Sequence, residues 1–201
     1  MVIPCYVSGK GMHATDWTRQ FKVEVIQILE TTGRGYDTRY RYYRQQFPEM
    51  DPGALARLVC DPIEYYDKDW MAYRAAHRMG RDEDEVITTF VMQKDALFRH
   101  QAQAVIYCYD EASFGSGLST MRFIMEHKPI LGFYNPSVKD QGVNLHNVLQ
   151  LAIEFPRLVT LVRYWTLAEI QPKLLAWFQG LIGCARQRRF SVFNTKEKDA
   201  T

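Results

Sequence analysis

Short apolar runs alternate with stretches of helical periodicity along the chain. Each run is too short for a typical helix and is rich in β-branched and aromatic residues, which favours buried strands. Strands are expected at residues 2–7, 104–109, 129–134 and 158–164. Between and after these runs, apolar residues recur at helical spacing. Five helices are expected. The first is capped by Thr15 or Asp16, the second covers 82–100, and the third follows the central strand and ends near His127. The fourth covers 144–155, and the last begins at the capping box Thr166-Leu167-Ala168-Glu169.

Strands that alternate with helices are typical of a parallel sheet with crossover helices. The pattern predicts an α/β, Rossmann-like (flavodoxin-like) fold, with an open, mainly parallel sheet of about five strands and helices on both faces. From Gly33 to Gly80 the periodicity weakens, and helical pieces are expected at 53–60 and 70–77. We expect this segment (33–80) to be a mainly helical insertion in a single domain of residues 1–186, followed by a polar tail, 187–201.

One run in that segment, Arg39-Tyr40-Arg41-Tyr42-Tyr43-Arg44, interleaves cations with aromatic rings. Such a run can contact phosphates and stack on bases, although it more often forms an amphipathic surface or a subunit contact. The formal net charge of the chain is only +2. Because the chain has no general excess of basic residues, binding of nucleic acid is not expected.

The composition limits the class of protein further. A chain of 201 residues, 47% of them hydrophobic, can form one sizeable core. Its cysteines are far apart, and no Cys-x-x-Cys or Cys/His spacing indicates a metal, so we expect neither metal nor cofactor. The absence of a signal peptide and of an apolar run of membrane-spanning length favours a cytoplasmic protein with reduced thiols and no membrane partner.

Two glycine-containing turns follow predicted strands and form the candidate ligand site. Ser8-Gly9-Lys10-Gly11 follows the first strand, and Ser113-Phe114-Gly115-Ser116-Gly117 follows the central one. Ligands of open α/β sheets bind outside the carboxyl ends of the strands, where glycines let backbone N–H groups approach an anion. The positive end of the helix after each turn would add to this attraction. The turns therefore predict a phosphate site. The alternative for the first turn is an ordinary βα turn with a solvated lysine.

Three carboxylates are candidates for catalysis. Asp110 and Glu111 come directly after the central strand, and Asp95 lies on the helix before it. A carboxylate there could activate water or attack a sugar directly. Acidic residues at such positions more often cap helices, form turns or are solvated. The sequence leaves both interpretations open.

The spacing from Lys94 through Pro136, together with the first turn, resembles the nucleoside 2-deoxyribosyltransferase-like superfamily, and most closely its 2'-deoxynucleoside 5'-phosphate N-hydrolases. The matching residues are Val7-Ser8-Gly9-Lys10-Gly11, Asp95, Ser113, Gly115, Gly117 and, after a one-residue gap, Asn144. The resemblance implies that Asp95 faces the base or leaving group, and that the second turn holds the 5'-phosphate through backbone N–H groups and a hydroxyl. It also implies a homodimer or higher homo-oligomer in which Asn144 reaches the neighbouring subunit's site.

The chain departs from this family at the position of the nucleophile. Two residues past the second turn the family has a glutamate, with a glycine two positions later, whereas this chain has Ser119 and Met121. Gln103 also replaces a family aspartate at the start of the central strand. An unactivated serine hydroxyl is a much poorer nucleophile than a carboxylate for attack on an anomeric carbon.

We therefore expect a protein that binds a small-molecule nucleotide, nucleoside or nucleotide sugar, and whose N-glycosidic chemistry is weak or lost. One alternative is an active N-glycosidase or deoxyribosyltransferase that uses a relocated carboxylate at Asp95, Asp110 or Glu111. Another is an interaction protein in which the segment 33–80 covers the pocket or joins subunits.

Overall fold

A computed structural model shows a parallel sheet of five strands in the order β2-β1-β3-β4-β5. It describes residues 2–10, 14–60, 62–77, 79–111, 114–137 and 145–182, with the backbone alone at 62–69, 114 and 145. The strands are β1 (Ile3–Ser8), β2 (Gly35–Asp37), β3 (Ala104–Cys108), β4 (Ile130–Tyr134) and β5 (Val159–Arg163). The predicted α/β class and open parallel sheet are confirmed, and each predicted strand is present to within two residues at either end.

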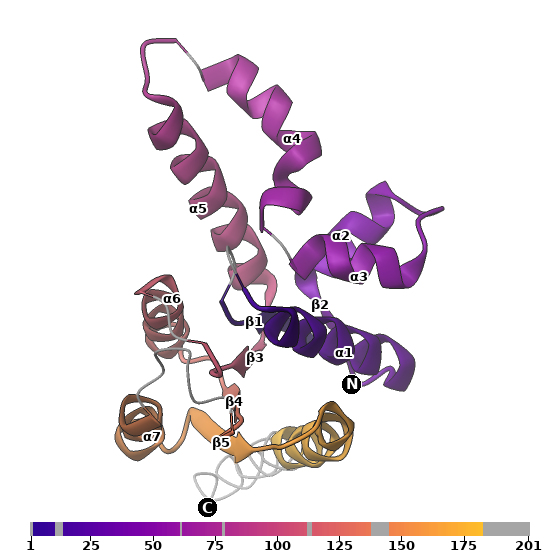
Figure 1. The fold of residues 1–201 in the computed structure, drawn as a ribbon, viewed down its shortest axis with the longest axis vertical. Helices are drawn as coiled ribbons and strands as arrows, with labels where there is room; N and C mark the ends of the chain where they lie inside the picture. The colour runs from indigo at the N-terminus through magenta and orange to yellow at the C-terminus, as the bar shows by residue number, and fades with distance from the viewer. Residues whose placement is uncertain are drawn as a thin grey trace, which may run out of the picture.

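Helices cover both faces of the sheet (Figure 1). On one face lie α1 (Asp16–Thr32) and the helix of residues 170–182, and on the other lie α5 (Glu83–Gln101), α6 (Phe114–Met125) and α7 (Leu145–Glu154). Ring contacts show the same division. Phe21 of α1 packs on Phe133 of β4 at 5.4 Å between centroids, and Phe123 of α6 packs on Tyr6 of β1 at 5.4 Å. The core therefore forms two layers, one on each side of the sheet.

The segment 33–80 contributes to the sheet as well as to the helices. Its first residues form the edge strand β2, which the sequence pattern did not predict. The rest forms α2 (Thr38–Gln46), α3 (Pro52–Cys60) and α4 (Pro62–His77), which include both helical pieces that were expected. In Figure 1, α4 and the first part of α5 lie side by side and extend away from the sheet. This helical pair is held by Trp70 and Tyr73, whose rings contact Phe90 at 5.6 and 4.9 Å.

The run of arginine and tyrosine residues lies on α2, and part of it is buried. Arg39 and Tyr43 are 4% and 1% exposed. The Arg39 guanidinium donates to the backbone oxygen of Val7 and pairs with Asp37 at 3.4 Å. The Asp37 carboxylate in turn accepts from the N–H groups of Val7, Arg39 and Tyr40 at 2.8 to 2.9 Å. These bonds continue the edge of β1 beyond the end of β2, so this part of the run is structural.

Two expected helix starts are confirmed. The side chain of Thr15 caps α1, and the Glu169 carboxylate accepts from the N–H of Thr166 at 3.2 Å in the expected capping box. Among the helices that the structure describes, none has the length and apolar character needed to cross a membrane.

Candidate functional site

The sheet order places a topological switch point between β1 and β3. These neighbouring strands lie in the centre of the sheet, and their connections lead to opposite faces, α1 on one and α6 on the other. In open α/β sheets a crevice opens outside the carboxyl ends of two such strands, and ligands bind there. At this edge β1 ends at Ser8 and is followed by Gly9 and Lys10, and β3 is followed by Asp110 and Glu111. The structure therefore brings the loops after the first and central strands together, as the sequence analysis expected.

Glu111 joins the β1–α1 loop to the end of β3. Its carboxylate is buried and accepts from the N–H and hydroxyl of Thr15, both at 3.0 Å, and from the Lys10 ammonium at 3.3 Å. Burial alone would raise the pKa of Glu111, but the donors around its carboxylate, those of Thr15 and Lys10 among them, outweigh burial and lower that pKa below its ordinary value. Glu111 thus occupies the positive end of α1, where the sequence allowed a phosphate. Lys10 is paired with a carboxylate and is not a simple solvated lysine.

Asp110 is enclosed by hydrogen-bond donors from three elements. One oxygen accepts from the N–H of Asn135 at 2.6 Å. The other accepts from the Trp17 indole N–H at 2.9 Å and from the Tyr164 hydroxyl. Asp110 is 3% exposed, so its carboxylate is not available to solvent. This arrangement ties α1 to the ends of β3, β4 and β5, and it favours a structural role.

The glycines of the second turn lie in a helix. Gly115, Ser116 and Gly117 were expected in a turn, but α6 begins at Phe114 and includes them. Gly115 and Gly117 are exposed, and a Cβ at Gly117 would meet no heavy atom within 4 Å. Backbone N–H groups in the first turn of a helix have no acceptor within the helix, so they remain suited to an anion. The expected turn at these residues is thus wrong, although N–H donors remain at that place.

Two stacked tyrosines of the β3 region hold this end of α6 on the sheet. The rings of Tyr107 and Tyr109 are 4.4 Å apart, and their hydroxyls bond to the Ser116 oxygen at 3.0 Å and to Thr120 at 3.3 Å. Burial raises the pKa of Tyr107 to about 12, so its hydroxyl remains a donor at neutral pH. The Tyr109 ring lies across Gly132 of β4, where a Cβ would come within 2.4 Å of it. These tyrosine contacts therefore hold the start of α6 against the sheet.

Asp95 lies on α5, on the same side of the sheet as α6. It is half-buried and accepts from the hydroxyl of Tyr6 at 3.2 Å. Burial is the larger cause and the nearby Asp95 charge the second of a pKa of Tyr6 above its ordinary value, so the Tyr6 hydroxyl donates to Asp95. The guanidinium of Arg39 lies 4.5 Å from the centre of the Tyr6 ring. Asp95 is thus connected to β1.

The remaining sequence-predicted residues are distributed as follows. Ser119 is half-buried on α6, and Met121 is 41% exposed. Gln103 lies at the amino end of β3, where its N–H donates to Pro4 at 2.8 Å, so it is at the opposite edge of the sheet. Gly11, Ser113 and Asn144 lie outside the described residues.

Sequence reasoning missed Lys22, Trp17 and Tyr164. Trp17 and Tyr164 bind Asp110 across long sequence separations, which no local pattern reveals. Lys22 was detectable in principle, because it falls among the buried positions of α1, between Phe21 and Val25, where an ammonium is unusual.

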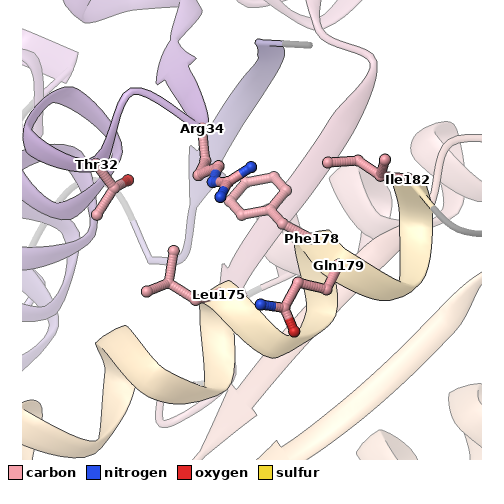
Figure 2. A pocket seen from close by; sticks show the side chains of 6 residues that line it. All are labelled: Thr32, Arg34, Leu175, Phe178, Gln179 and Ile182. Carbon is pink, nitrogen blue, oxygen red and sulfur yellow. The ribbon is translucent and has the colours of Figure 1, made fainter.

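Figure 2 shows a pocket of about 320 Å³ at the amino-terminal edge of the sheet, since Arg34 immediately precedes β2. Its lining consists of Thr32, Arg34, Leu175, Phe178, Gln179 and Ile182. A groove of about 860 Å³ between α1 and α3 is lined by other residues, Arg19 and Arg57 among them. Neither cavity is lined by a sequence-predicted site residue, so the candidate site remains the edge beside β1 and β3.

No protein-family model matches the chain, and no significant match was found among curated proteins. Within the described ranges, no three His, Cys, Asp or Glu side chains come together as a metal site would require.

Proposed function

We propose that this protein binds a nucleoside 5'-phosphate or a nucleotide sugar at the carboxyl edge of β1 and β3, with N-glycosidic chemistry that is weak or lost. The observation that supports this most directly is the sheet order β2-β1-β3-β4-β5. It puts the switch point beside the two loops whose residues resemble a nucleotide site. Ligands of this sheet order bind at that point.

The first turn of α6 is the proposed phosphate site. Gly115 and Gly117 expose backbone that a phosphate can approach, and the helix dipole favours an anion there. The bond from Tyr107 to the Ser116 oxygen holds this turn, so its donors need little reorganisation on binding. The end of α1 is a weaker candidate, because Glu111 already fills it with an internal carboxylate.

The surroundings of the carboxylates support binding more than catalysis. Asp110 and Glu111 both direct their oxygens at donors from within the chain, which leaves neither placed to attack a sugar. Ser119 lacks the charge that makes a carboxylate a good nucleophile here. Asp95 is the candidate that would orient the base or protonate it. A relocated nucleophile would have to be one of these carboxylates, so slow or absent base release is expected.

Self-association is part of the proposal. Exposed apolar side chains follow one stripe of α6, at Leu118, Met121 and Met125, and two more lie on α7, at Leu149 and Ile153. Both helices cover the same face of the sheet (Figure 1). Apolar stripes of this kind are typical of subunit contacts. They support the homodimer that the resemblance implies.

The phosphate site can be tested with paired ligands. The four 2'-deoxynucleoside 5'-monophosphates and their nucleosides are titrated calorimetrically into the protein, and released base is followed by chromatography. Each monophosphate that binds should do so roughly 10- to 100-fold more tightly than its nucleoside, because hydrogen bonds to a charged group contribute about 1.5 to 3 kcal/mol. Base release should be very slow. Equal affinity for the two ligands would contradict the phosphate site, and rapid base release would contradict the proposed loss of N-glycosidic activity.

Glycine variants locate the site on α6. Gly117→Asp introduces a carboxylate into the first turn, with open space for its Cβ. It should weaken the monophosphate about tenfold through like-charge repulsion, while the nucleoside is affected less. Gly117→Ala is the steric control. Gly180→Asp is the charge control, because Gly180 is another exposed helical glycine with open space. Equal effects of the Gly117→Asp and Gly180→Asp changes would place the phosphate elsewhere.

A further inference from the structure

A buried ammonium supports the candidate site from within the α1 layer. Lys22 is 2% exposed, and its Nζ donates to the backbone oxygen of Lys10 at 2.6 Å and to that of Cys60 at 3.2 Å. Lys10 belongs to the β1–α1 loop, and Cys60 is the last residue of α3. One side chain therefore connects the loop at the switch point to the helical segment that follows β2.

This connection is electrostatically well matched. Removing an ammonium from water is costly unless its donors are satisfied, so a buried lysine needs strong acceptors. The carbonyl of Cys60 lies at the C-terminus of α3, where the last carbonyls lack partners within the helix and the dipole is negative. A methionine would fill the same core volume without this desolvation. The lysine is therefore explained by the two carbonyls that it joins.

The loop passes directly over this side chain. A Cβ at Gly9 would lie 3.5 Å from the Cε of Lys22 and 3.2 Å from the Cβ of Cys108, so the backbone at Gly9 is already close to both. Gly9 also has a φ of 156°, a backbone conformation that residues with a side chain rarely adopt. Lys10 is then held twice, at its carbonyl by Lys22 and at its ammonium by Glu111. The positions of Gly9 and Lys10 are thus determined by contacts with Lys22 and with residues at the end of β3.

We propose that Lys22 is a positioning residue for the phosphate end of the ligand, and that it couples the β1–α1 loop to the C-terminus of α3. This inference depends on the proposed function, because it concerns the same site. Lys22 does not contact the ligand. It holds the loop that forms one wall of the crevice, opposite the start of α6, and it links ligand binding to the order of α3.

The decisive quantity is the phosphate preference, defined as the Kd of the nucleoside divided by the Kd of its monophosphate. Lys22→Met keeps the chain length and removes the donors, so the preference should fall on the order of tenfold, the scale expected when a binding wall shifts. Lys22→Arg keeps a buried cationic donor and should retain more of the preference. Lys173→Met is the matched control, since Lys173, which is only half-buried, also donates to a backbone carbonyl, that of Arg163 at 2.6 Å. A general loss of folding would weaken both ligands equally and would leave the preference unchanged.

A measurement on the wild-type protein covers the case in which Lys22→Met does not fold. Hydrogen exchange is followed with and without the monophosphate. Binding should slow exchange both in the β1–α1 loop and in the last turn of α3, because Lys22 joins them. Protection of the loop without α3 would overturn the coupling, and a phosphate preference that Lys22→Met leaves intact would overturn the positioning role. If the wild type has no phosphate preference, the proposed function itself fails, and this inference fails with it.

Discussion

Glu111→Gln should destabilise the protein through the loss of one buried charge. The variant keeps the side-chain volume and one carbonyl oxygen, but its amide nitrogen would face donors of Thr15 or Lys10. A hydrogen bond to a charged group contributes about 1.5 to 3 kcal/mol, and breaking a buried ion pair costs about 3 to 5 kcal/mol. Because the Lys10 side chain is 28% exposed, its ion pair with Glu111 contributes at the low end of the range for a buried pair. We therefore expect the free energy of unfolding to fall by about 2 to 3 kcal/mol.

Urea denaturation at several pH values measures this effect and its origin. With a slope of about 2.5 kcal/mol per molar urea, the midpoint at pH 7 should fall by roughly 1 M. The pKa of Glu111 is lower in the folded protein than its ordinary value of 4.5. Its stabilising contribution is therefore complete above that value and is lost as the pH falls through the lower, folded-state pKa. The difference between wild type and variant should shrink over the same range.

Two results would refute this reasoning. A difference that stays constant from pH 7 down to acid would show that the charge of Glu111 contributes nothing. A difference that grows toward low pH would mean that the folded-state pKa is raised. Glu169→Gln serves as the control, because Glu169 also accepts from a lysine and from backbone N–H groups but lies in an exposed capping box. It should shift the midpoint less.

Two further variants test the support and the chemistry of the site. Gly132→Ala should lower the free energy of unfolding by about 1 to 3 kcal/mol, because its Cβ would come within 2.4 Å of the Tyr109 ring; a thermal melt measures this, and an unchanged stability would contradict the close packing. Ser119→Glu combined with Met121→Gly should raise base release above the wild-type rate, because it places a carboxylate where the enzymes that the sequence resembles have their nucleophile. Chromatography of single and double variants follows the product, and equal rates in all of them would count against lost chemistry at Ser119.

The sequence was sufficient for most of the sheet, because buried parallel strands are continuous apolar runs. The edge strand β2 has no such run, since it is only Gly35-Tyr36-Asp37. Its place depends on contacts far apart in the chain. A Cβ at Gly35 would lie 2.7 Å from the Ile3 oxygen, so the close pairing of β2 with β1 requires glycine there. A local sequence pattern does not predict such a contact.

The candidate site was predicted in position but not in detail. The low helix propensity of glycine favoured a turn at Gly115 and Gly117, whereas the tertiary bond from Tyr107 to the Ser116 oxygen helps to hold them in α6. The sequence also left Asp110 and Glu111 open between catalysis and structure. Their donors come from the β1–α1 loop, from α1 and from the residues that follow β4 and β5. They are visible only in the fold, where every carboxylate oxygen of the pair is bonded.

A crystal structure with a bound 2'-deoxynucleoside 5'-monophosphate tests the central claim most directly. The account predicts phosphate density against the backbone of Gly115 and Gly117 at the start of α6, with the base on the side of Asp95 and the glycosidic bond intact. Phosphate at the amino-terminal edge beside Arg34, or in the groove between α1 and α3, would contradict the site. Free base and sugar phosphate in the crevice would contradict the loss of chemistry.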